Sequence, residues 1–362
     1  MAYQNTGTPR FWVSTLQWLA YMGRLTEYGS TNQPESLSDK PIYDLVYIDP
    51  IKQLTWQAAT PSANGVFLLG WKITNKNFSD YMPNDNNFYM MLGHTLKNTY
   101  YSVTKIGGEY EQLAGHGLVN FSNNNQATPN DGFTISIGNN AEDHIGDVLG
   151  VRFDVGDNYS NPNGFNIGEE YKMGSFLYGT FYDMPHSPDL SLTMEVEMDG
   201  INQFRSKGGF TVPNYKYLSS PLWGDYPAWE LDTTDPGLRR IGRRSWDLSF
   251  SFLQESDLFT GYEGVTNYGI TNDNSDGLHA YDNLLKNNDF FSQVIYKTCG
   301  GKLPFIFQPE GGAIVTGGEI DLQSSNNNPD QFAICVLDMN SFTVKRVAKK
   351  LYNCNLKIRE VW

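Results

Sequence analysis

Short apolar runs separated by turn-forming residues constrain the fold of this chain more than any other feature. Asn, Gly and Asp, which favour tight turns, lie between the runs, and no helical periodicity connects one run to the next. Runs of this length and separation are typical of the strands of a sandwich or jelly roll. In the middle of the chain they occupy residues 65–71, 87–96, 132–138, 148–155 and 174–184.

The composition agrees with a β-rich fold and argues against one class of function. Aromatic residues, which favour strands, make up 14% of the 362 residues, and 35 glycines are available for turns. With 26 basic and 40 acidic residues, the formal net charge is −14, which argues against a dedicated nucleic-acid-binding face. We therefore expect a mainly β protein.

Neither the N-terminus nor the cysteines suggest a secreted or membrane protein. The first 25 residues have no basic stretch before an apolar run, and that run is shorter than the roughly 20 residues that a membrane span requires. Cys299, Cys335 and Cys354 have no CxxC spacing and leave one thiol unpaired in any single-bridge scheme. We interpret the cysteines as buried thiols of a protein made in a reducing compartment. We also expect that the protein has no membrane partner.

Strands are also expected on both sides of the middle region. Residues 10–13 predict a strand that continues into a short helix, and residues 42–48 alternate like a second strand. The Asp-Gly dipeptide at 199–200 predicts a hairpin, because this pair favours the tight turn between two alternating runs. The two strands of that hairpin would be residues 190–198 and 201–210.

The last third of the chain predicts a strand, a helix and then three strands. Alternation over residues 243–253 places Trp246 and Phe252 on the same face of a strand. A helical stretch follows Asp276 and ends at Gly300, since glycine favours the position just after a helix. The further strands are expected at residues 302–310, 330–339 and 349–362.

Motifs that carry enzyme chemistry are missing from the sequence. It contains no HExxH metal motif, GxSxG nucleophile elbow, P-loop or GxGxxG turn. We interpret the five histidines as hydrogen-bonded structural residues, while the many carboxylates leave a glycosidase pair open as an alternative. Asp154, Asp157, Asn158 and Asn161 have the short spacing of a Ca²⁺ loop, although such residues more often stabilise turns. We expect no enzyme, no catalytic or metal-binding residues and no cofactor.

Arginines cluster just before the strand at 243–253, on a chain that is otherwise acidic. Arginine binds a carboxylate through two parallel hydrogen bonds, so the cluster suits a contact with an acidic neighbouring subunit. Aromatic side chains are also favoured in subunit interfaces. The candidate interface residues are Arg239, Arg240, Arg243, Arg244, Trp246 and Trp362.

The order of elements in the last third resembles a known family. The segments SWDLSFSFL, NDFFSQVIYKTCGGKLPFIFQPE, DQFAICVLDMNSF and LKIREVW follow one another as in the tail-tube-like β-sandwich of bacteriophage distal tail, or baseplate hub, proteins. In the middle, FYMMLGHTLKN is similar to a strand and turn of the galactose-binding-like jelly roll inserted in such proteins, with Thr95 in place of the usual Asn. GSFLYGTFYDMPHSPDL is similar to the segment where the chain leaves that jelly roll.

The resemblance implies both an organisation and a function. Residues 1–60 would be an arm of the tube-like domain, 61–188 a jelly roll and 189–362 a hub domain with one packed helix. The protein would be a structural virion component, made in the host cytoplasm, whose copies form a ring, of six by resemblance, around the tail channel. Its partners would be other copies, the tail tube, tail-tip or fibre proteins, and DNA in transit. A host-surface glycan is a further candidate, with Trp71, His94 and Tyr100 as its contacts.

Two other functions are open at this point. The first is a different position in the virion, as an adaptor, a fibre-attachment protein or a capsid decoration protein. The second is a carbohydrate-binding, lectin-like module or carbohydrate-active enzyme built on the jelly roll. That second function predicts that loop aromatics such as Trp71 and Tyr100 contact sugar.

Overall fold

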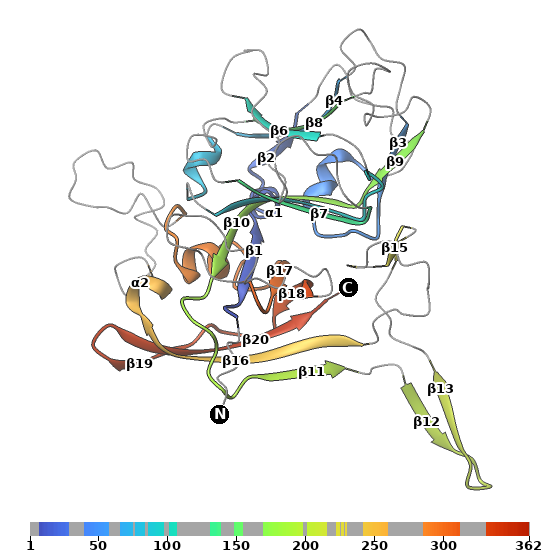
Figure 1. The fold of residues 1–362 in the computed structure, drawn as a ribbon, viewed down its shortest axis with the longest axis vertical. Helices are drawn as coiled ribbons and strands as arrows, with labels where there is room; N and C mark the ends of the chain where they lie inside the picture. Colours follow the sequence, from blue (N-terminus) through green and yellow to red (C-terminus); the bar gives the residue numbers. More distant parts are fainter. Residues whose placement is uncertain are drawn as a thin grey trace.

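The expected mainly β fold is confirmed by the computed structural model (Figure 1). Most of the described residues outside loops belong to antiparallel sheets, and the helical elements are short. The structure describes residues 7–28, 40–57, 66–74, 77–83, 86–97, 101–106, 131–138, 148–154, 169–197, 201–215, 222–224, 226–227, 229, 242–259, 285–311 and 331–361.

A ten-stranded antiparallel sheet runs through the molecule. Its strand order is β11-β16-β20-β18-β17-β1-β10-β5-β7, and β19 pairs with the remaining free part of β20. The strands are β1 (Arg10–Ser14), β5 (Asn87–Leu92), β7 (Phe133–Gly138), β10 (Ser175–Asp183), β11 (Thr193–Glu197), β16 (Arg243–Gln254), β17 (Phe305–Gln308), β18 (Ala333–Leu337), β19 (Val344–Ala348) and β20 (Leu351–Glu360).

Smaller elements surround this sheet. A four-stranded sheet has the order β2 (Leu25–Glu27), β4 (Val66–Ile73), β8 (Val148–Asp154) and β6 (Tyr101–Ile106). The two-stranded pairs are β3 (Leu54–Gln57) with β9 (Glu170–Met173), β12 (Ile201–Arg205) with β13 (Thr211–Tyr215), and β14 (Leu222–Trp223) with β15 (Tyr226–Pro227). The helical elements are α1 (Thr15–Tyr21), α2 (Glu255–Leu258), the 3₁₀ turns η1 (Ile42–Val46) and η2 (Phe78–Asp80), and the π-helical turn η4 (Phe291–Tyr296).

Strand β1 lies at the centre of the ten-stranded sheet. It pairs with β10 on one side and with β17 on the other, and all five of its residues are buried. The Arg10 guanidinium binds the Asp183 carboxylate through both oxygens, and the Trp12 indole N–H donates to the Gln308 side chain at 3.2 Å. These bonds connect β1 to the last residue of each neighbouring strand. The strand can be buried because it is covered on both faces and because Asp183 pairs with the charge of Arg10.

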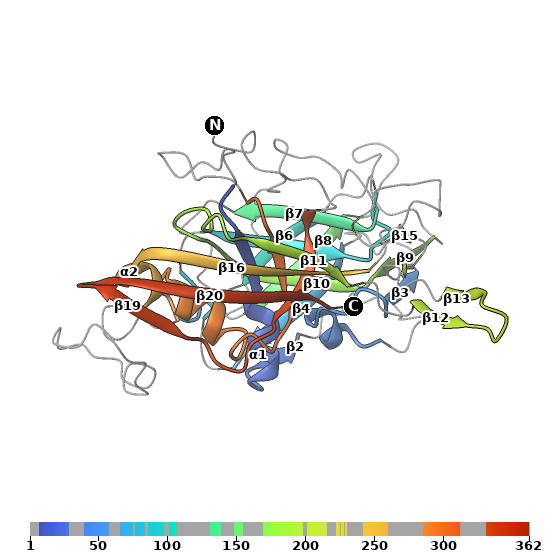
Figure 2. The same ribbon diagram turned by 90° about the horizontal axis from the view of Figure 1, so that it is seen from below.

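The core is divided among three clusters of side chains. One fills the space between β5 and β10 and the four-stranded sheet, where the ring of Trp71 stacks on Phe176 with centroids 5.2 Å apart. A second packs β16, β18 and β20 against η4, and includes Phe11 from β1. A third lies on the opposite face of β1 and contains Trp12. Figure 2 shows the long strands β16 and β20 side by side along one flank of the molecule.

The sheet runs across both expected domain boundaries. β1 comes from the expected arm, β5, β7 and β10 from the expected jelly roll, and the other strands from the expected hub. β10 is bonded directly to β1 over residues 10–14, and β1 to β17. The division at 60/61 and 188/189 therefore does not follow a break in the hydrogen-bonded sheet.

Most of the expected strands are present, but two local predictions were wrong. Residues 42–46 form the 3₁₀ turn η1 and not a strand, because Pro41 begins a turn in which the Asp44 N–H donates to its carbonyl at 3.1 Å. The expected hairpin of 190–198 with 201–210 is also absent: β11 pairs with β16, and β12 pairs with β13. A long-range partner thus replaced the local one that the Asp-Gly turn signal favoured.

A third difference concerns the outer end of β16. Trp246, Leu248 and Phe250 share a buried face as expected, whereas Phe252 is exposed and has a φ of 63°. The pairing with β20 shifts register between Phe250 and Leu253, which marks a β-bulge. The extra residue turns Phe252 outward and lets Leu253 enter the core instead.

The close approach of the end of β1 to its neighbour β10 requires glycine at residue 179. Gly179 is opposite Ser14, the residue where β1 ends and α1 begins, and a Cβ there would overlap the Val13 carbonyl oxygen and the Thr15 nitrogen. We predict that Gly179→Ala lowers the free energy of unfolding by about 3 kcal/mol, because backbone must move to admit the methyl group. Urea unfolding would measure the loss.

The matched control for this prediction is Gly208→Ala. A Cβ at Gly208 has no neighbour closer than 3.8 Å, so the variant should unfold at the wild-type urea concentration. Equal stability of the Gly179→Ala variant and the wild type would show that the end of β1 does not approach β10 as closely as described.

Candidate assembly surface

Strand β11 forms one end of the ten-stranded sheet and carries an exposed apolar row. Among the described residues, nothing is hydrogen-bonded to the edge of β11 that faces away from β16. Met194 is 59% exposed and Val196 40%, and Leu192, just before the strand, is exposed as well. Alternate residues of a strand point to opposite faces, so Glu195 and Glu197 form a second, acidic row on the other face.

The apolar row is exposed because the core ends under β16. Met194 is directly opposite Trp246, whose ring is buried against Phe307 with centroids 5.1 Å apart. Met194 therefore extends the apolar face of the sheet one strand beyond the residues that cover it. Apolar side chains on an open strand edge mark a site for pairing with another chain.

A β-hairpin follows β11 and projects from the body of the molecule. Figures 1 and 2 both show β12 and β13 extending beyond the other described strands. Phe204 is 57% exposed and its cross-strand partner Val212 is exposed too, while Phe210 at the turn is 77% exposed. Two exposed phenylalanines within one projecting hairpin are typical of a contact surface, since exposed aromatic anchors dominate interface energetics.

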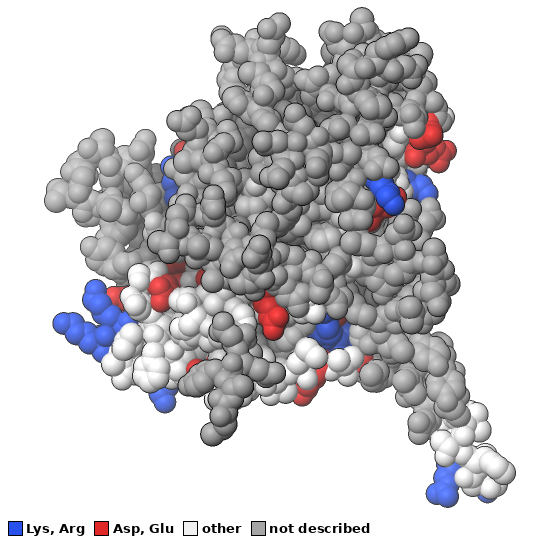
Figure 3. Space-filling model, in the orientation of Figure 1, with Lys and Arg blue, Asp and Glu red and all other residues white. Residues whose placement is uncertain are grey.

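The tip of this hairpin is basic. Arg205 and Lys207 are exposed there, and Figure 3 shows blue side chains at the end of the projection. Gly209 has a φ of 84°, which a side chain would strain, and its N–H donates to the Ser206 carbonyl at 2.9 Å. Side chains stabilise the turn as well: the Ser206 hydroxyl accepts from the Phe210 N–H at 3.1 Å, and Arg205, which is exposed, donates from Nε to the Gly209 carbonyl at 3.4 Å.

The other outer strands of the sheet differ from β11 in their side chains. β7 is the opposite end, and its described side chains are buried or half-buried, with Phe133 packed against Trp229 at a centroid distance of 5.1 Å. β19 carries exposed Lys345 and Arg346, and its pairing shifts register at Arg346, which are two ways of blocking edge-to-edge association. Among the described outer strands of the ten-stranded sheet, β11 is the one that carries a row of exposed apolar side chains.

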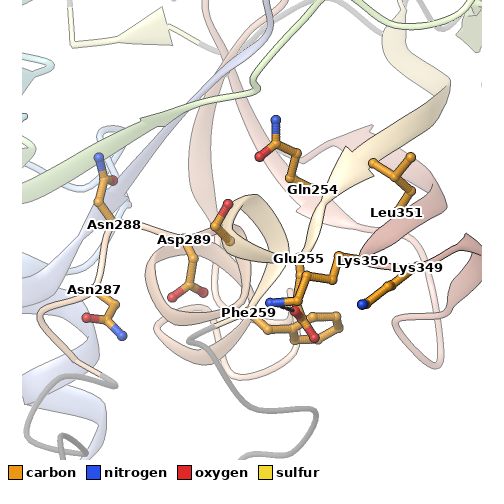
Figure 4. Close-up of a pocket in the computed structure, with 10 residues that line it drawn as sticks. Gln254, Glu255, Phe259, Asn287, Asn288, Asp289, Lys349, Lys350 and Leu351 are labelled. Carbon is orange, nitrogen blue, oxygen red and sulfur yellow. Dashed lines mark ion pairs between the residues drawn. The ribbon is translucent and has the colours of Figure 1, made fainter.

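A cavity of about 770 Å³ lies between α2, the start of η4 and the turn from β19 to β20 (Figure 4). Its rim contains an ion pair between Glu255 and Lys350, with 3.4 Å between the carboxylate oxygen and Nζ. Asp289 lies deeper, and burial raises the pKa of its carboxyl to about 6. A raised carboxyl pKa inside a cavity is one mark of acid–base sites.

The hydrogen bonds of Asp289 indicate a structural role. One carboxylate oxygen accepts from the Ser292 N–H at 2.8 Å and the other from the Ser292 hydroxyl at 2.9 Å, so the carboxylate caps the first turn of η4. Lys297, which directly follows η4, donates to the Gln293 amide oxygen at 2.6 Å, and burial lowers the pKa of Lys297 to about 7. These groups fix η4 beneath the sheet.

Two of the three candidate glycan contacts are corrected by their burial. The side chains of Trp71 and His94 are completely buried, so neither can touch a sugar. Trp71 stacks between the two sheets, and His94 is the hydrogen-bonded structural histidine that its alternative interpretation predicted. Tyr100 lies outside the described residues.

The candidate interface residues are divided by the structure. Trp246 is buried in the core, and the Arg244 guanidinium binds the Glu360 carboxylate and the Phe332 carbonyl of the same chain, so both act within the subunit. Arg243 is half-buried beside β11. Four of the expected site residues and loops lie outside the described residues: Arg239, Arg240, Trp362 and the expected Ca²⁺-loop residues 157–161. The side chain of Asp154 and residues 277–284 of the expected helix lie outside them as well.

The cysteines, possible metal sites and possible membrane spans were the remaining features that the sequence raised. Cys335 and Cys354 are buried free thiols as expected, and Cys299 is a partly buried one. Within the described part of the chain, no cluster of three His, Cys, Asp or Glu side chains has the arrangement of a metal site. No helix among those residues is long and apolar enough to cross a membrane.

Comparison with known proteins found no match to a family model, to a curated protein or to a solved structure.

Sequence reasoning missed the β11 row and the projecting hairpin. The alternation of residues 190–198 was recognised as a strand, but alternation does not tell which of two faces is covered. One signal was available in the sequence: Phe204 and Phe210 flank a basic, glycine-containing turn, which places aromatic residues next to a segment expected to be exposed.

His94 supplies a pH-dependent test of this structure. The Leu96 N–H donates to Nδ1 at 3.2 Å, so Nε2 carries the proton and donates to the Thr134 hydroxyl at 2.9 Å. Burial lowers the histidine pKa from 6.5 to about 3, so between these pH values only the unfolded chain binds the proton. We predict that the free energy of unfolding falls by about 1.4 kcal/mol per pH unit below pH 6.5 through this group.

The measurement compares the wild type with His94→Gln, which cannot titrate. Between pH 7 and pH 5 the stability difference between the two proteins should change by about 2 kcal/mol, with the wild type losing more. Parallel pH dependences of the two proteins would contradict the burial of His94.

Proposed function

We propose that this chain is a non-enzymatic structural protein that assembles with copies of itself. The observation that carries the proposal is the open edge of β11 with its apolar row, followed in the chain by a projecting hairpin with exposed phenylalanines. Both features lower the solubility of a monomer, because open strand edges and exposed apolar side chains favour association. In an assembly each becomes buried contact area.

We extend the proposal to the class that the last third of the sequence resembles, the distal tail or baseplate hub proteins of tailed bacteriophages. Copies would surround the tail channel, bind the tail tube and the tail-tip or fibre proteins, and leave a path for DNA. The order β16, η4, β17, β18 and β20 along the chain supports this setting, because it is the order of elements on which the resemblance depends. The net charge of −14 also suits a channel wall that DNA passes without binding.

The proposal predicts self-association in solution. Light scattering after size exclusion should give a mass that is a whole-number multiple of 40.9 kDa and that falls on dilution. Negative-stain electron microscopy at micromolar concentration should show closed rings with a central hole wide enough for duplex DNA. A mass of one chain at every concentration tested, with single compact particles, would contradict self-assembly.

A further inference from the structure

We propose that the β12–β13 hairpin of one copy adds to the open edge of β11 in the next copy. This inference rests on the proposed function and names the contact through which the copies would assemble. Addition of a strand to a sheet edge satisfies the free backbone groups of both partners, and the side chains determine which strands fit. The occupant of the β11 edge is therefore a second copy of this chain.

The β12–β13 hairpin and strand β11 each have an apolar face, and each has a charged residue on the opposite face. On the hairpin, Phe204 and Val212 are a cross-strand pair on one face, while Arg205 and Thr211 are a pair on the other. On β11, the exposed apolar row of Met194 and its neighbours occupies one face and the acidic row the other. When the hairpin lies beside β11 in the plane of the sheet, apolar residues meet apolar ones on one face, and Arg205 meets carboxylates on the opposite face.

Glu195 is the carboxylate best placed for such a contact. It is exposed and lies opposite Ser245 on β16, whereas Glu197 is less exposed and already has Arg243 opposite it. Two copies of a chain with a net charge of −14 repel each other at long range. Association therefore favours contacts that bring a local basic group against a local acidic one, within the roughly 8 Å over which charges act at physiological salt.

The hairpin has one edge that is better able to pair. The Ser206 N–H donates to the Phe210 carbonyl at 2.8 Å, and bonded and non-bonded pairs alternate along an antiparallel ladder. Phe204 and Val212 are then a bonded pair, and Gln203 and Pro213 are not. The missing N–H of Pro213 thus falls on the outer edge of β13, which leaves the outer edge of β12 intact for pairing.

The arrangement also explains why a second copy, and not the chain's own β11, is the partner. The hairpin points away from the body in both views, so within one chain the two surfaces do not meet (Figures 1 and 2). Each copy carries both a hairpin and an edge, on different surfaces, so the contact runs from one copy to the next. A head-to-tail contact of this kind closes into a ring when a whole number of the rotations that relate one copy to the next adds up to 360°.

A charge reversal tests the contact in the full-length protein. Arg205→Glu and Glu195→Arg should each weaken self-association about tenfold, since like charges then face each other across the interface. The double variant places both reversed charges in every interface and should recover most of the wild-type association, as coupled residues do in a double-mutant cycle. Sedimentation equilibrium gives the association constants, and circular dichroism checks that each variant is folded.

Phe204→Ser tests the apolar face of the same contact. It should weaken association at least about tenfold, because an aromatic anchor is lost. Phe252→Ser is the matched control, since Phe252 is 68% exposed on the bulge of β16, away from the hairpin. Lys345→Glu on the charged edge of β19 is the control for the charge reversals.

The outcomes separate this inference from the proposed function. Loss of association in both single reversals with recovery in the double variant supports the contact. A wild type that assembles, with all variants associating as strongly as the controls, overturns the hairpin contact and leaves self-assembly standing. A wild type that stays monomeric at every concentration overturns both.

Discussion

Two hydrogen-bonded ladders on the five-residue strand β1 hold the ten-stranded sheet together. Without β1, the strands before residue 184 and those after residue 192 would have no shared backbone bonds within this sheet. The Arg10–Asp183 ion pair strengthens the joint, and removing one partner of a buried pair typically costs about 3–5 kcal/mol. The central position of β1 also explains why the sheet continues across the expected boundaries at 60/61 and 188/189.

Much of the fold could be predicted from local pattern. The strands at β4, β5, β7, β8, β10 and β16 were visible as apolar runs, and Ser14, whose hydroxyl accepts from the Gln17 N–H at 3.2 Å, begins the expected helix. Patterns over a few residues fail where distant partners compete. β11 pairs with the distant β16 and not with β12, the next strand in the sequence. The bulge at Phe252 depends on the pairing of β16 with β20.

The site was harder to predict than the fold, for a physical reason. Trp71 and His94 are residue types that bind sugars on a surface, but the same types fill a core, and only the packing of two sheets decides between these roles. The reverse holds for Met194 and Val196, whose apolar side chains would be core residues in most strands. They are exposed because β11 extends past the last covered strand.

Amide hydrogen exchange tests the central claim, that β11 and the hairpin are the contact between copies, most directly. Peptides covering 190–197 and 201–210 should exchange fast in dilute protein and slowly in concentrated protein, because strand addition protects edge amides. The peptide covering β19, whose edge is charged, should exchange equally at both concentrations. Assembly without a change of exchange in β11 and the hairpin would contradict the account.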